Sequence, residues 1–182
     1  MTRRTVTMST LAQAVAFATE AHRGMTRKDE EASPYINHPL AVVAILVEEG
    51  GIADCATLCA AILHDTIEDT GTTHGELVER FGREVADIVR EVSDDKRFDK
   101  QVRKDLQIAH TAYASPRAKL VKLADKIANM RDILDRPPVG WSGERKREYF
   151  DWAARVVLGI RGTHPDLERI FDSVHRRRAE LT

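Results

Sequence analysis

The adjacent pair His64-Asp65 is the first feature of this sequence that could do chemistry. It follows the apolar run Ala60-Ala61-Ile62-Leu63, so two strong metal donors stand side by side at the end of a segment with a buried character. Imidazole nitrogen and carboxylate oxygen together suit a divalent ion such as Mn²⁺, Fe²⁺ or Zn²⁺. Such an ion takes further ligands, so the sequence predicts a metal site that other segments complete.

His38 and Asp125 are the best candidates for the missing donors. His38 stands at the head of an expected helix, and Asp125 lies inside the apolar stretch 120–130. Each also has an ordinary structural interpretation: His38 could cap a helix, and Asp125 could pair with Lys122 or Arg131. A buried carboxylate is costly unless it is paired or bound to a metal. Because all four donors lie in or beside apolar segments, we favour one shared metal site.

Two carboxylates after the pair could act on a water molecule. Glu68 lies four residues beyond His64 and Asp69 four beyond Asp65, so a continuing helix would place them on the same face. A carboxylate there can orient an attacking water or take its proton. The alternative is that residues 68–71 form only an acidic turn.

Several polar residues could hold an anionic ligand. Asn129 lies four residues after Asp125 on the same helical face, where its amide could read a polar edge of the ligand. The other candidates are the loop cations Arg27 and Lys28, and the more distant Lys100, Arg145 and Tyr149. Isolated basic residues are normally solvated, so these residues alone leave their role open.

The elements that must position these residues all have helical patterns. Apolar spacing and capping residues predict helices from Ser9 to before Gly24, Pro39 to about Glu49, Asp54 towards Asp65, Thr73 to Gly82, around 85–92, Lys100 to Tyr113, Pro116 through Met130, Ser142 through Val156, and from Thr163-Pro165 to the basic run 175–178. No segment shows the alternation of a half-buried strand. The expected fold class is therefore all-α.

Composition limits the other possibilities. A length of 182 residues suits one domain, which we expect to span residues 1–182 with a core at about 9–181. The formal charge of −1 argues against a nucleic-acid binder. No apolar run approaches the ~20 residues that cross a bilayer. Residues 1–10 lack the apolar segment of a signal peptide, and Cys55 and Cys59 fit a reducing compartment, so we expect a cytoplasmic protein.

The ordered donors resemble a known signature. His38, His64-Asp65 and Asp125 match the H…HD…D order of the HD superfamily of metal phosphohydrolases. Longer strings resemble the hydrolase domain of RelA/SpoT alarmone enzymes: Arg27-Lys28, Pro34-Tyr35-Ile36-Asn37-His38-Pro39-Leu40, the run 61–70 and Lys122-Leu123-Ala124-Asp125-Lys126. Gly140-Trp141-Ser142 and the run 148–153 are similar to the stand-alone members, the metazoan SpoT homologues (Mesh-type) and bacterial small alarmone hydrolases. The resemblance extends from about Leu11 to Leu181.

This resemblance implies an all-α HD-domain helical bundle that hydrolyses (p)ppGpp to GDP or GTP and pyrophosphate, usually with Mn²⁺. It assigns metal binding to His38, His64, Asp65 and Asp125, and activation of the attacking water to Glu68 and Asp69. It implies nucleotide contacts for Arg27, Lys28 and Asn129, and phosphate or ribose contacts for Lys100, Arg145 and Tyr149.

Some alternatives stay open beside this resemblance. Asp132 stands where the long enzymes usually have Thr, and no synthetase domain follows within the 182 residues, so we expect a stand-alone hydrolase without synthesis. The same site could remove a phosphate from another nucleotide such as NADPH. A non-catalytic alarmone sensor is the alternative from another class. The expected partner is a small nucleotide, with no nucleic acid or membrane, and the oligomeric state is undetermined.

Overall fold

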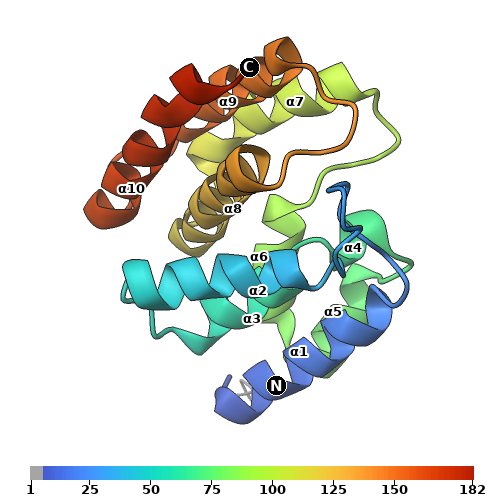
Figure 1. The fold of residues 1–182 in the computed structure, drawn as a ribbon. Coiled ribbons are helices and arrows are strands. Elements are labelled where there is room, and N and C mark those ends of the chain that lie inside the picture. The colour runs from blue at the N-terminus through green and yellow to red at the C-terminus, as the bar shows by residue number, and fades with distance from the viewer. Residues whose placement is uncertain (1–5) are drawn as a thin grey trace.

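The computed structural model describes residues 6–182, which form helices joined by turns and loops, with no strand among them (Figure 1). This confirms the all-α class. Residues 1–5, which belong to the predicted domain and to the N-terminal stretch analysed above, lie outside the described residues. No helix in the described part is long and apolar enough to cross a bilayer.

The helices follow one another in chain order. They are α1 (Met8–Ala21), α2 (Asn37–Ala44) with a π-helical end η1 (Ile45–Glu49), α3 (Cys55–Leu63), α4 (Thr66–Asp69), α5 (His74–Phe81), α6 (Arg83–Val92), α7 (Lys100–His110) with a 3-10 turn η2 (Thr111–Tyr113), α8 (Pro116–Asp135), α9 (Gly143–Leu158), and α10 (Pro165–Arg176) with η3 (Arg177–Glu180).

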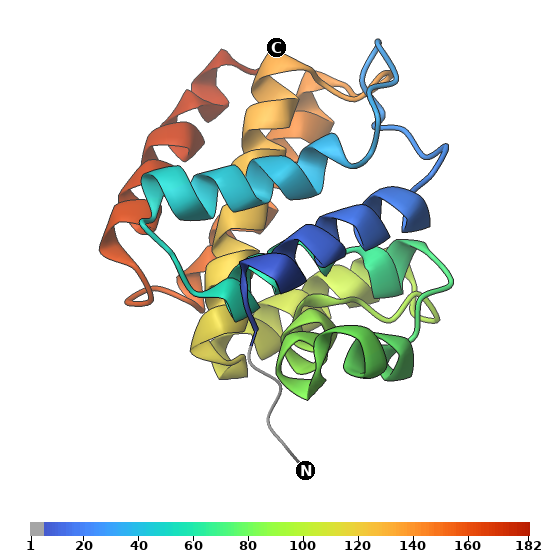
Figure 2. The ribbon, with the colours of Figure 1, turned by 90° about the horizontal axis from the view of Figure 1, so that it is seen from below.

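Two helices form the centre of the bundle. Every residue of α3 from Ala56 to Leu63 is buried, as expected of a helix that is apolar all round. It packs against α1, α2, α6 and α8. The 20-residue α8 continues this core to the other half, where α9 and α10 pack against it. Figure 2 shows α2 crossing α8, and this crossing brings the candidate site residues of the two helices together.

Three boundaries differ from the sequence expectation. The N-cap of α1 is Thr7. Its hydroxyl accepts a hydrogen bond from the Thr10 backbone N–H, and the Thr10 hydroxyl accepts one from the Thr7 backbone N–H, so Ser9 lies inside the helix. The cap of α10 is the His164 side chain rather than Thr163. The helix from Asp54 does not run through Asp65: α3 ends at Leu63 and the separate α4 follows.

The break between α3 and α4 has a local cause. The Thr66 hydroxyl donates to the Leu63 carbonyl at 2.6 Å, which satisfies an acceptor at the end of α3. Asp65 takes φ −93° and ψ −5° and becomes the N-cap of α4. The premise of one continuous helix through residues 64–69 was therefore wrong. A turn presents His64 and Asp65, and a new short helix presents Glu68 and Asp69.

Candidate metal centre

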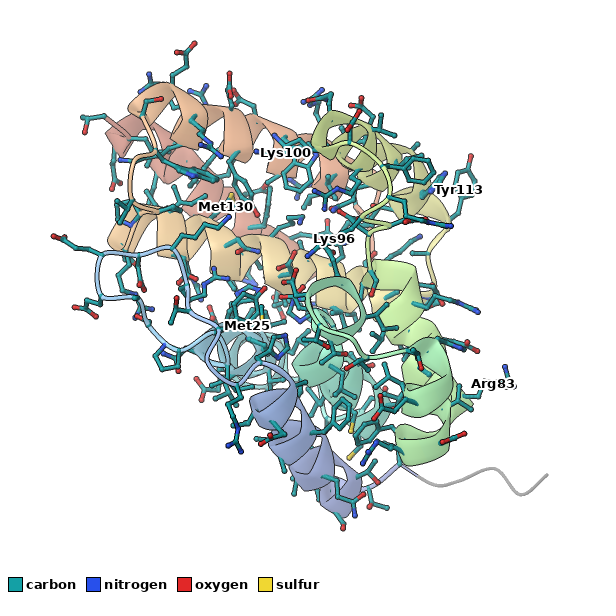
Figure 3. All side chains as sticks on the ribbon, turned by 90° about the vertical axis from the view of Figure 1, so that its right-hand side faces the viewer. Met25, Arg83, Lys96, Lys100, Tyr113 and Met130 are labelled. Carbon is teal, nitrogen blue, oxygen red and sulfur yellow. The ribbon has the colours of Figure 1, made fainter. Side chains whose placement is uncertain are left out.

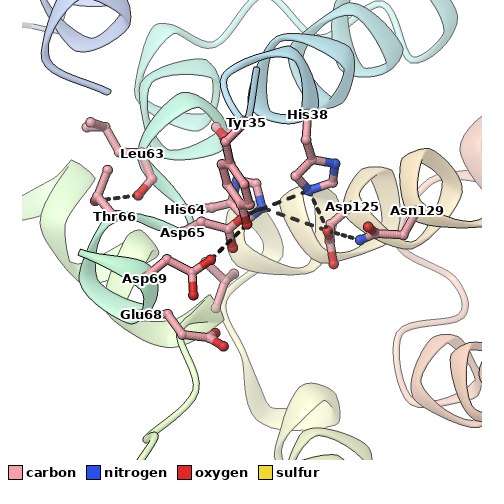
Figure 4. A network of polar contacts seen from close by, with 12 residues as sticks. Tyr35, His38, Leu63, His64, Asp65, Thr66, Glu68, Asp69, Asp125 and Asn129 are labelled. Atoms are coloured by element: carbon pink, nitrogen blue, oxygen red, sulfur yellow. Dashed lines mark hydrogen bonds and ion pairs between the residues drawn. The ribbon is translucent and has the colours of Figure 1, made fainter. Parts of the chain in front are cut away.

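Four donors from three separate segments lie close together (Figure 4): the ligand atoms of His38, His64 and Asp65 all lie within 4.8 Å of one another, and Asp125 approaches the two imidazoles. His38 Nε2 lies 3.2 Å from Asp125 Oδ1 and 3.8 Å from Asp65 Oδ2, and His64 Nε2 lies 3.7 Å and 3.1 Å from the same two oxygens. His38 comes from the first turn of α2, His64 and Asp65 from the turn after α3, and Asp125 from the middle of α8. His38 is therefore not a helix N-cap, which is Ile36.

The donor set fits a small divalent ion. Ligands on one ion with bonds of about 2.1 Å lie roughly 3 to 3.5 Å from their neighbours, close to the spacing of these nitrogen and oxygen atoms. His64 Nδ1 donates to the Ala61 carbonyl at 2.8 Å, which leaves Nε2 as the atom directed at the carboxylates. A backbone acceptor on the far ring nitrogen is the usual arrangement around a metal-binding histidine.

The electrostatics of the site also favour a cation. Burial lowers the pKa of His64, but the carboxylates of Asp65 and Asp125 outweigh it and raise the pKa to about 10. Burial would raise the pKa of Asp65, yet the two imidazoles hold that pKa below its usual range. Without a metal, a proton on His64 balances one of the two carboxylate charges. A divalent ion can replace that proton, since metal binding and deprotonation are linked.

Lys126 and Tyr35 complete the surroundings of the donors, and sequence reasoning missed both. Lys126 Nζ lies 2.9 Å from Asp125 Oδ2 and 4.4 Å from the Trp152 ring centroid. The expected partners of Asp125 bond elsewhere: Lys122 donates to the Val92 carbonyl and Arg131 pairs with Glu49.

Tyr35 links two carboxylates across the site. Its hydroxyl lies 2.7 Å from Asp65 Oδ2 and 2.8 Å from Asp69 Oδ2, and its ring stacks on His22 with centroids 4.8 Å apart. One phenolic proton can serve only one of these oxygens at a time. The position of Tyr35 three residues before His38, ahead of an expected helix, was the available signal in the sequence.

Glu68 and Asp69 lie beside the donors and face different partners. Glu68 Oε2 accepts from the Asp94 backbone at 3.2 Å, and Oε1 lies 3.3 Å from Arg103 Nη1. Burial, followed by the charges of Asp94 and Asp65, raises the pKa of Glu68 to about 7. Asp69 bonds Tyr35 and the ammonium of Lys96.

The structure distributes the six candidate ligand-binding residues between two adjoining cavities. The first, of about 360 Å³, is bordered by Arg27, Lys28, Asn129 and Tyr149 and reaches Tyr35 and Asp69. The second, of about 450 Å³, is bordered by Lys28, Lys100, Arg145 and Tyr149. Trp141 borders both cavities, and Arg145 lies 4.4 Å above its ring. Trp141 belongs to a motif that resembles the stand-alone hydrolases, but no role at the site was predicted for it.

Asn129 bonds on both sides rather than facing the cavity with free polar atoms. Its Nδ2 lies 2.6 Å from Asp125 Oδ1, and its Oδ1 accepts from Arg27 Nη2 at 3.1 Å. Arg27 also pairs with Asp132 at 2.7 Å. Arg27 is thus fixed in the wall of the first cavity. By contrast, Lys28, Lys100 and Arg145 make no ion pair among the described residues, which leaves their charges available to an anionic ligand.

Comparison with known proteins identifies the family of this chain. The HD domain family model matches residues 14–150. The chain is 54% identical over 160 residues to guanosine-3′,5′-bis(diphosphate) 3′-pyrophosphohydrolase MESH1 of Xenopus tropicalis, covering 88% of this chain and 89% of the relative. It is 49% identical over 168 residues to the Homo sapiens protein of that name, covering 92% and 94%.

A solved structure gives the same picture for the fold. It is described as a metazoan orthologue of SpoT that hydrolyses ppGpp and plays a role in starvation responses. It superimposes with a TM-score of 0.92 at 43% identity, covering 98% of this chain and 100% of the other. The expected HD-domain helical bundle is therefore confirmed.

Proposed function

Because the chain belongs to the HD domain family, and within it to the MESH1-type pyrophosphohydrolases, we propose that it hydrolyses (p)ppGpp to GDP or GTP and pyrophosphate. One observation carries this proposal: two imidazoles and two carboxylates converge beside cavities bordered by Lys28, Lys100 and Arg145, three cations that make no ion pair among the described residues. A divalent ion at the donors would neutralise charge on the phosphate that is cleaved, and cations in the cavity would hold the other phosphates of a highly charged nucleotide.

We assign the ion to His38, His64, Asp65 and Asp125, with Mn²⁺ as the preferred metal and Fe²⁺ or Zn²⁺ as alternatives. A divalent ion held there would supply neutralisation of the phosphate charge and polarisation of a water molecule. The buried Lys126 helps to keep Asp125 ionised and oriented, because its ammonium lies 2.9 Å from the oxygen that does not face the imidazoles.

Glu68 and Asp69 are the proposed groups for the attacking water. Water adds to the phosphorus next to the ribose, the bond from that phosphorus to the 3′ oxygen breaks and pyrophosphate is released. The 3′ oxygen takes up a proton to become a hydroxyl, which balances the proton that the attacking water gives up. Glu68 can accept the proton of the water, since its raised pKa of about 7 suits a general base near neutral pH. Asp69, held by Tyr35 and Lys96, can orient the water.

The cavities suggest how the substrate is placed. Arg27 has a guanidinium fixed by Asn129 and Asp132, and such a plane can stack on a purine base. We propose that Arg27, Lys28 and Asn129 form the nucleoside side of the site. Lys100, Arg145 and Tyr149 border the second cavity and would contact the phosphates and ribose.

The proposal is tested by measuring pyrophosphate release from ppGpp by purified protein, with added Mn²⁺ and with EDTA. We expect release only with metal, and its loss in Asp65→Ala but not in Asp166→Ala, which removes an exposed carboxylate in α10. A parallel assay follows phosphate release from NADPH. Failure to release pyrophosphate would overturn the proposal: phosphate from NADPH alone would reassign the substrate, and tight ppGpp binding without product would indicate a sensor.

A further inference from the structure

The Glu68 carboxylate is held by two donors that both come from one stretch of chain. The Asp94 backbone N–H donates to Oε2 at 3.2 Å, and Arg103 Nη1 lies 3.3 Å from Oε1. Among the described residues, Glu68 forms its ion pair with Arg103. Their side chains are 24% and 21% exposed, so solvent screens this pair less than it would a surface pair.

Arg103 also occupies a second location of interest. It lies on α7 three residues after Lys100, and both residues border the second cavity with the unpaired cations. Figure 3 labels Lys96 and Lys100, which mark the path from the connector after α6 into α7. Helix α7, which presents cations to the second cavity, thus also contacts Glu68 of α4, a helix that lies far from α7 in the sequence.

The surroundings of Glu68 explain why a cation is needed there. The negative charges near it are those of Asp94, Asp65 and Asp69, and each of them disfavours an ionised Glu68. Lys96 does not meet this need, because it pairs with Asp69 and its side chain is 50% exposed. Exposed pairs of this kind contribute little. The Arg103 guanidinium has five N–H donors, of which one contacts Glu68, while its buried Nε has no hydrogen-bond partner among the described residues.

We propose that Arg103 is a positioning residue for the hydrolysis: it fixes the Glu68 carboxylate in the orientation in which it meets the attacking water. It acts through Glu68 and from the wall of the cavity that takes the phosphates. This inference rests on the proposed function, and it adds a residue to which neither the sequence motifs nor the comparisons give a role.

The test compares Arg103→Met and Arg103→Lys with the matched control Arg97→Met. Arg97 lies in the loop just before α7, is exposed, and forms an ion pair only with Asp95 among the described residues. For Arg103→Met we expect kcat for ppGpp to fall about 10- to 100-fold with KM changed less than about 3-fold, because an interaction with the catalytic group is lost. Arg103→Lys should recover part of kcat, and Arg97→Met should match the wild type. A raised KM with unchanged kcat would make Arg103 a simple phosphate contact and overturn the inference.

A double-mutant cycle with Glu68→Gln separates positioning from a general structural role. If Arg103 acts through Glu68, Arg103→Met should cause little further loss in the Glu68→Gln background. Equal losses in both backgrounds would contradict the inference, and thermal unfolding of each variant checks that the fold is intact.

One readout does not need turnover. The ¹³C carboxyl signal of Glu68 can be titrated in the metal-free protein, and its midpoint should move to higher pH in Arg103→Met but not in Arg97→Met. An unchanged midpoint would overturn the inference whatever the substrate proves to be. Absence of pyrophosphate release by the wild type, with the shifted midpoint present, would instead count against the proposed function.

Discussion

Lys126 Nζ lies 2.9 Å from Asp125 Oδ2, and both side chains are buried, at 4% and 11% exposure. Removing one partner of a buried pair leaves an uncompensated charge. We predict that Lys126→Met destabilises the metal-free protein by about 2 to 4 kcal/mol. Because a bound divalent ion supplies positive charge to Asp125, Mn²⁺ should restore more stability to this variant than to the wild type.

Thermal unfolding in EDTA and in MnCl₂ measures both effects for the Lys126 variant. Lys119→Met, on the same helix and without an ion pair among the described residues, is the control. An equal response of wild type and Lys126→Met to Mn²⁺ would show that Lys126 does not share the charge of the metal site.

His64 and Glu68 should separate metal binding from water activation. His64→Ala removes a donor, so bound metal measured by elemental analysis and ppGpp turnover should both be lost. Glu68→Ala should keep the metal and lose rate by about 10²- to 10⁴-fold, as expected for a missing general base. The exposed His110→Ala is the control for the histidine variant. Loss of metal from Glu68→Ala would recast Glu68 as a ligand.

Glu68 should also destabilise the metal-free protein at high pH. Burial, then Asp94 and Asp65, raise its pKa from 4.5 to about 7. The folded protein binds this proton more tightly than the unfolded chain does, so stability falls as pH rises from 4.5 to about 7 and the penalty is complete above that range. Allowing for partial exposure, the penalty is roughly 1 to 2 kcal/mol.

Glu68→Gln should therefore unfold at a higher temperature than the wild type at pH 8 in EDTA, and the gain should shrink towards pH 5. Differential scanning calorimetry at several pH values measures this trend, with the exposed Glu79→Gln as the control. A gain that did not depend on pH would have to come from something other than Glu68 ionisation.

Tyr35 should contribute through its hydroxyl more than through its ring. Tyr35→Phe removes the hydrogen bonds to Asp65 and Asp69 but keeps the stacking on His22. Because the hydroxyl orients the carboxylates of Asp65 and Asp69, kcat should fall about 10- to 100-fold, and the lost hydrogen bonds to charged groups should lower the free energy of unfolding by about 1.5 to 3 kcal/mol. Steady-state kinetics of Tyr35→Phe and of the exposed Tyr113→Phe test this. Equal kcat values for the two variants would remove Tyr35 from the site.

The sequence predicts the helices well where a local signal marks their ends. Thr73 and Ser142 cap α5 and α9 as expected, because each hydroxyl bonds a backbone N–H three residues ahead. The break after Leu63 could not be predicted in this way. The break depends on the hydrogen bond from the Thr66 hydroxyl to the Leu63 carbonyl. A threonine in a helical pattern can also point its hydroxyl elsewhere, so the sequence does not predict this bond.

Helical spacing identified residues on one face, and so it suggested Asn129 beside Asp125. It could not identify Lys126, which is adjacent in sequence to Asp125 and reaches it by side-chain length. Helical spacing also could not show that both polar atoms of the Asn129 amide form hydrogen bonds, Oδ1 with Arg27 and Nδ2 with Asp125. Contacts between α4 and α7, such as Glu68 with Arg103, depend on tertiary packing that periodicity does not describe.

The crossing of α2 and α8 has a consequence for the life of the chain. His38 and Asp125 face each other only after the C-terminal half has docked on the N-terminal half, so an ion can meet all four donors only in a finished molecule. An ion held by these four donors would therefore favour the docked arrangement of α2 and α8 by mass action.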